Sequence, residues 1–154
     1  MVYKETMTGS PFAARIFESV KRRQNIIVNN LSKENKKVFG RRIAKLMHNQ
    51  ALPVLYWIIR RVVMEDYEAV VPEIVSVLAS STSLTLDMTI FVMLWALNEH
   101  KEGPVNIKTH EFQPWFKNII TFISNFFRKY LDADIQPVFD HILLKTGLPF
   151  EELE

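Results

Sequence analysis

Apolar residues recur along this chain at a spacing near 3.6 residues, and that period constrains the fold more than any other feature. Side chains three and four positions apart share one face of an α-helix, whereas the residues of a strand alternate at every second position. Valine and isoleucine are frequent here, but they follow the helical period. The aromatic residues between Trp115 and Tyr130 follow it too, which favours core packing over a platform for stacked bases. The sequence therefore predicts an all-α fold.

About seven helices are predicted, and capping residues and prolines mark most of their ends. Six of them cover approximately residues 11–29, 33–49, 53–63, 84–98, 114–130 and 135–146, and the fourth in chain order has a possible cap at Asp66 and an apolar stripe from Val71 to Leu78. Ser10 and Ser32 are suitable N-caps for the first two helices, and Asp132 or Asp134 for the last. Pro72 must either kink the fourth helix or start it. The fifth helix is apolar nearly all round, which is typical of a helix in the middle of a bundle.

Short links between these helices favour antiparallel hairpins stacked in order, as in a HEAT-type α-solenoid. We expect a flexible N-terminus over residues 1–9, either native or left by cloning. Residues 10–148 are the predicted helical-repeat domain, and residues 149–154 are a predicted acidic tail. The longest apolar stretch, residues 84–97, is interrupted by Asp87 and is shorter than the roughly 20 residues that a membrane span needs, so no membrane contact is expected.

The residue types needed for catalysis are scarce, and the pattern of the rest does not supply them. The absence of cysteine excludes disulfides, thiolate metal sites and cysteine nucleophiles, and it favours a reducing compartment. No two of the four histidines have the i, i+4 spacing of a helical zinc site. Four isolated glycines cannot form a phosphate-binding loop. We therefore predict a binding protein without enzymatic activity and without a cofactor.

Charge is distributed unevenly along the chain. Residues 1–64 carry 13 Lys and Arg against 3 Asp and Glu, which gives a net charge of +10, whereas residues 65–154 have a net charge of −8. Within the basic half, Lys37, Arg41, Lys45 and His48 recur at i, i+4, i+8 and i+11, so they share one helix face. We call these four residues the basic row. The candidate binding residues are those of the row and its flanks: Lys33, Lys36, Lys37, Arg41, Arg42 and Lys45.

Two interpretations of the basic row stay open at this stage. Most runs of charge are simply solvated helix faces. However, no acidic residue follows Glu34 in this helix, so the row is not neutralised within its own helix and could contact RNA phosphates or an acidic protein surface. The clusters Lys21-Arg22-Arg23 and Arg60-Arg61 are expected near it.

Two runs in the basic half have a familiar order. Leu31-Ser32-Lys33-Glu34-Asn35-Lys36 is followed by Gly40-Arg41-Arg42-Ile43-Ala44-Lys45-Leu46-Met47-His48. This order resembles the large scaffold subunit of the THO complex, with Ala44 where the family has a second glycine. The similarity continues at Pro72, at Thr82-Ser83-Leu84 with Asp87, at Ala96-Leu97, at Trp115 and at Phe127-Arg128-Lys129-Tyr130, so it spans about residues 26–146.

The resemblance implies more than the composition does. It implies a nuclear protein of the THO/TREX assembly, which packages nascent mRNA for export. It also implies a domain similar to the middle domain of translation initiation factor 4G, and domains of that type grip the RecA lobes of a DEAD-box ATPase. The expected partners are therefore the mRNA-export ATPase of the DEAD-box class and other THO subunits, with direct RNA binding by the basic half as the alternative.

Overall fold

The computed structural model describes residues 10–30, 34–64, 71–78, 83–100 and 102–146. Its helices are α2 (Pro11–Asn29), α3 (Lys36–Met64), α4 (Val71–Leu78), α5 (Ser83–Glu99), α6 (Pro114–Lys129) and α7 (Gln136–Thr146). In these ranges the only β-type pairing is an isolated antiparallel bridge between Val105 and Phe112. The predicted all-α class is confirmed, and the arrangement is consistent with a helical solenoid. The predicted flexible N-terminus, the Ser32 and Asp66 caps and the acidic tail lie outside the described residues.

The helix starts follow the capping chemistry of the sequence in most places. Pro11 occupies the first turn of α2 after Ser10, whose backbone is extended but whose side chain makes no capping hydrogen bond. At the start of α7 the Gln136 amide donates a 3.0 Å hydrogen bond to a carboxylate oxygen of Asp134, so Asp134 is the capping acid rather than Asp132. The helix α4 starts at Val71 and contains Pro72 in its first turn, where no amide donor is needed.

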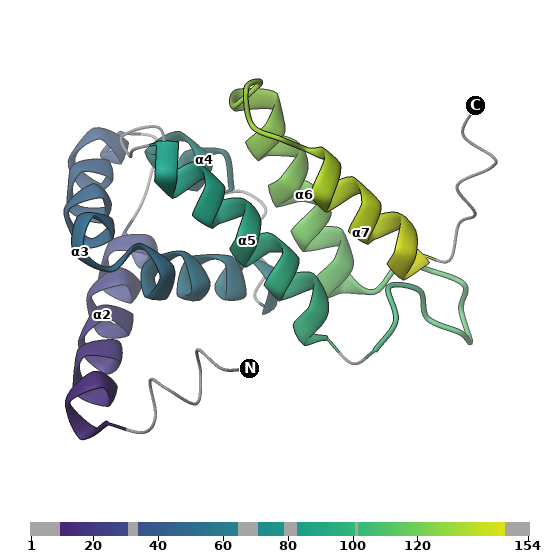
Figure 1. Cartoon of the computed structure of the whole chain (residues 1–154), viewed down its shortest axis with the longest axis horizontal. Coiled ribbons are helices and arrows are strands. Elements are labelled where there is room, and N and C mark those ends of the chain that lie inside the picture. The colour runs from purple at the N-terminus through teal and green to yellow at the C-terminus, as the bar shows by residue number, and fades with distance from the viewer. Residues whose placement is uncertain (1–9, 31–33, 65–70, 79–82, 101, 147–154) are drawn as a thin grey trace.

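A sharp bend divides α3 into two halves, and Figure 1 shows it as a bent ribbon. The bend lies at Gln50, whose backbone is non-helical (φ −149°, ψ 55°). Pro53 explains it, because a proline inside a straight helix lacks the amide for one hydrogen bond and collides with the preceding turn. After the bend, Pro53 lies in the first turn of the second half, where its missing amide costs little. The two helices predicted for this region therefore form one kinked element.

The second half of α3 is the centre of the molecule. Between Val54 and Val63 seven side chains are buried, and α3 packs against α2, α4, α5 and α6. The expectation that the fifth predicted helix occupies the centre was wrong. The helix α5 packs on α3, α6 and α7, but Leu84 and Phe91 on its free edge are 64% and 56% exposed.

The aromatic stripe of α6 is core, as predicted. Trp115, Phe116, Phe122 and Phe126 are buried, together with Ile119 and Ile123. On α7 the predicted inward face is only partly buried, because Val138 and Leu143 are enclosed whereas Ile135 and Phe139 are 49% and 44% exposed.

Polar contacts fix the end of α6 to α4. The Tyr130 hydroxyl donates a 2.8 Å hydrogen bond to the Val75 carbonyl, and the Lys129 ammonium lies 2.9 Å from the Ser76 hydroxyl. Burial raises the pKa of Tyr130 to about 12, because the charged phenolate would lose its hydration.

None of the helices, within the ranges described, is both long enough and apolar enough to cross a lipid bilayer.

The packing of α6 can be tested with two chemically identical substitutions. Phe126 is fully buried and Phe12 is 73% exposed. Phe126→Ala should reduce the free energy of unfolding by about 3–5 kcal/mol in urea titrations, because it removes buried rings and leaves a cavity. Phe12→Ala should change it by less than about 0.5 kcal/mol. Equal effects of the two would contradict this account of the core, and Phe126→Leu provides a milder test if the alanine variant does not fold.

Candidate interaction surface

The basic row lies on the exposed face of the first half of α3, residues 36–49. Lys37, Arg41, Lys45 and His48 are all exposed, whereas Ile43 and Met47 on the opposite face are buried. The helical period thus separates the cations from the core as the sequence predicted. The row is accessible to a partner along its length.

The flanking candidates are placed less uniformly. Lys33 lies outside the described residues, and Lys36 begins α3 without a described side chain. Arg42 is exposed, and its guanidinium carbon lies 5.2 Å from the centroid of the Phe39 ring, within the range of a cation–π contact. This contact orients Arg42 without neutralising its charge.

A groove of about 630 Å³ runs between α2 and the first half of α3. We call it the α2–α3 groove. Its floor includes Ile16, Val20, Ile27 and Leu46, and its basic lining residues are Arg15 and Arg23 from α2 with Arg42 and Lys45 from α3. No aspartate or glutamate is among the described residues that line the groove. The groove therefore joins an apolar floor to positively charged walls.

The groove divides the predicted candidates and adds two residues to them. Arg42 and Lys45 line it, whereas Lys37 and Arg41 lie on α3 outside its lining. Sequence reasoning did not single out Arg15 at all. A usable signal was present, because Arg15 and Arg23 are eight residues apart, about two helical turns, and so share a face of α2 with Ser19 between them.

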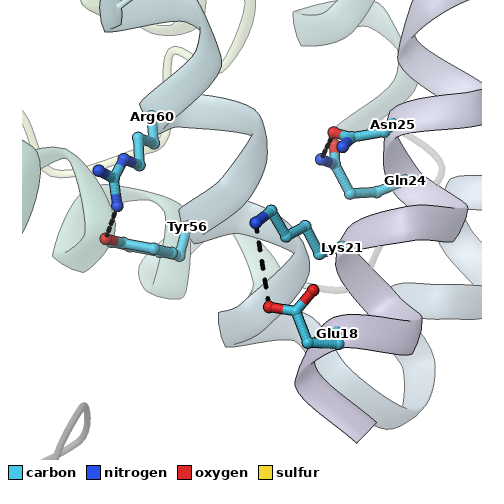
Figure 2. Close-up of polar contacts among 6 residues, drawn as sticks. All are labelled: Glu18, Lys21, Gln24, Asn25, Tyr56 and Arg60. Atoms are coloured by element: carbon cyan, nitrogen blue, oxygen red, sulfur yellow. Dashed lines mark hydrogen bonds and ion pairs between the residues drawn. The ribbon is translucent and has the colours of Figure 1, made fainter. Parts of the chain in front are cut away.

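Of the basic clusters expected near the row, Arg23 lines the groove with two of the candidates, whereas Lys21, Arg60 and Arg61 make contacts elsewhere. The ammonium of Lys21 lies 4.5 Å from the centroid of the Trp57 ring. It also lies 3.9 Å from a Glu18 carboxylate oxygen (Figure 2). Arg60 donates a 2.9 Å hydrogen bond to the Tyr56 hydroxyl, which lies 3.2 Å from a carboxylate oxygen of Glu99. These cations are engaged with aromatic rings where α2 and α5 meet the second half of α3.

Arg61 is likewise engaged in packing. Its guanidinium donates a 3.3 Å hydrogen bond to the Asn25 side chain, which links the second half of α3 to α2. Lys21 and Glu18 form an ion pair within α2. None of the four cations of the α2–α3 groove forms an ion pair with an acidic residue in the described part of the chain.

A second hollow, of about 980 Å³, lies where α5 ends and α6 begins, and titratable residues are among its lining. The rings of His100 and Trp115 stack within it, with centroids 4.2 Å apart and planes 7° from parallel. Burial lowers the pKa of His100, and Lys145 and Arg60 lower it further, while Glu99 and Glu102 oppose this shift. The described residues contain no group of three or more His, Asp or Glu placed to hold a metal ion.

Comparisons with known proteins add to this geometry. Residues 43–120 match the family model of the transcription- and export-related complex subunit, Thoc2. This match covers half of the chain and includes most of α3 and all of α4 and α5.

The chain belongs to this family.

Relatives of the Thoc2 family resemble nearly the whole chain. THO complex subunit 2 of Mus musculus is 26% identical over 151 residues, which is 97% of this chain. The Homo sapiens protein of that name is 25% identical over the same length, and the Arabidopsis thaliana protein is 25% identical over 127 residues, or 81% of this chain. The chain spans only 9% of the length of the mouse and human relatives. No solved structure matches it.

The partly buried position of His100 leads to a prediction about how the stability of the fold depends on pH. Because the folded-state pKa of His100 lies below its ordinary value, the folded state favours neutral His100, and this stabilisation is present above the unfolded-state pKa near 6.5. It is lost as the pH falls through that value toward the lower folded-state pKa. Urea unfolding of His100→Gln should therefore show a smaller decrease in stability between about pH 7.5 and pH 5 than the parent chain. Identical pH dependence in the two proteins would contradict the assignment.

Proposed function

We propose that this chain is a non-catalytic docking domain of a THO-type mRNA-export scaffold, and that it binds a DEAD-box RNA-dependent ATPase together with other THO subunits in the nucleus. Membership of the Thoc2 family is the observation that carries the proposal. The relatives are named as subunits of the THO complex, which supports a role in assembly rather than in covalent chemistry.

The division of α3 supports a docking role. Its second half holds the core, so the first half is fixed to a rigid base while its basic face stays exposed. Sites on rigid helices present side chains to a partner without a large ordering cost. The row of Lys37, Arg41 and Lys45 is suited to an acidic surface of an ATPase lobe, where complementary charge speeds association and fixes orientation.

Docking can be tested by calorimetry with the separate RecA lobes of the mRNA-export ATPase. At least one lobe should bind the chain with a dissociation constant of tens of micromolar or tighter, and Lys37→Glu/Arg41→Glu should weaken that binding by about tenfold. Lys108→Glu/Lys117→Glu is the matched control, because these exposed lysines belong neither to α2 nor to α3. If neither lobe binds, the ATPase-docking role fails for this domain.

Direct RNA binding is the alternative function, and the excess of positive charge in the basic half favours it. It would act through phosphate contacts, which release counterions and make affinity depend steeply on salt.

RNA binding predicts a specific salt signature. For three phosphate contacts the slope of log affinity against log salt should be about −2 on single-stranded RNA. Lys37→Glu/Arg41→Glu/Lys45→Glu should remove most of that slope in filter-binding or anisotropy measurements. An affinity that is indifferent to salt and to these charges would rule this alternative out.

A further inference from the structure

The α2–α3 groove has a lining that suits one kind of occupant. We propose that it binds an acidic amphipathic helix of a partner protein. The proposal stands on the lining of the groove and does not depend on docking of an ATPase lobe, so either can fail without the other.

The dimensions of the groove fit a short helix. Its lining on α2 extends from Arg15 to Ile27, which corresponds to about 18 Å at the helical rise of roughly 1.5 Å per residue. An occupant of about three turns would follow that length. A helix in a groove is held by apolar anchors at i, i+3, i+4 and i+7, which present one continuous stripe to the floor.

The floor of the groove is complementary to the apolar stripe of such a helix. Ile16 and Leu46 are only partly buried, and Ile26 at the end of the groove near the α2 C-terminus is 57% exposed. These side chains face the same hollow from two helices. The apolar stripe of an occupant would remove them from water.

The walls of the groove are complementary to the acidic residues of such a helix. Arg15 and Arg23 rise from α2, and Arg42 and Lys45 rise from α3, so an occupant meets cations on both sides. Aspartates and glutamates that flank its apolar stripe would reach both walls at once. Guanidinium groups bind carboxylates through paired hydrogen bonds, which also fixes the direction and register of the bound helix.

The lining favours a protein helix over RNA. Sites for single-stranded nucleic acid combine positive charge with aromatic rings on which bases stack. No aromatic residue is among the described residues that line this groove, and its floor is aliphatic. Lys37 and Arg41 of the basic row lie outside the lining, so a backbone-tracking RNA could use those two residues and leave the groove empty.

Fluorescence anisotropy with labelled peptides tests the proposal on the whole chain. The probe is a set of peptides of about 14 residues with leucines at helical spacing and glutamates on both flanks. The comparison probes have the same residues in scrambled order, lysine in place of glutamate, or an oligouridine strand. We expect the acidic amphipathic peptides to bind at tens of micromolar, and the scrambled and lysine peptides to bind at least about tenfold more weakly.

Variants locate the binding. Arg15→Glu/Arg23→Glu should weaken the acidic peptides by about tenfold or more, whereas Lys37→Glu/Arg41→Glu makes the same change in charge outside the groove and should weaken them less than about threefold. Ile26→Ser tests the floor at an exposed position that is not needed for folding, and it should weaken binding by about threefold. Circular dichroism melts verify that each variant is folded.

Three results would overturn the proposal. The first is the absence of binding by every acidic peptide at about 500 µM. The second is an equal loss in the two charge-reversal variants, which would show that only net charge matters. The third is binding of oligouridine, but not of the peptides, through Arg15 and Arg23, which would make the groove an RNA site.

Discussion

Burial of the second half of α3 is the interaction on which the rest of the structure depends. Leu55, Ile59 and their neighbours are almost fully enclosed, because α2, α4, α5 and α6 each bury an apolar face against this one helix. Each such side chain contributes on the order of 1.5–3 kcal/mol when it leaves water. The other helices are thus held to a common centre.

The bend at Gln50 gives the first half of α3 a different direction from the buried second half. Without it, the first half of α3 would continue the line of the buried half. With it, the two halves of α3 run in different directions (Figure 1). Residues of the first half and of α2 together line the α2–α3 groove. The basic row and the groove then present different chemistry to partners. The row is charged and open, whereas the groove is apolar at its floor and charged at its walls.

The sequence predicted the helices well because their signals are local. Periodicity and capping residues marked the start of α2 at Pro11, and Pro53 marked the division of α3. The sequence predicted the tertiary position of the helices poorly. The apolar composition of α5 does not reveal how many neighbouring helices surround it, and Phe91 on this helix is exposed. For the surface, the row on α3 was visible within one helix. Arg15 joins Arg42 and Lys45 only through packing of α2 on α3, which no spacing within one helix encodes.

We propose that α2 and the first half of α3 form the surface that receives a partner, while the second half of α3 serves as its rigid base. Amide hydrogen exchange of the chain, measured free and with the RecA lobes of the mRNA-export ATPase, would locate this surface. Binding should slow exchange in α2 and in residues 36–49, with no change in residues 54–63, which are already protected. Slowing confined to α5, α6 and α7, with none in α2 and residues 36–49, would contradict it.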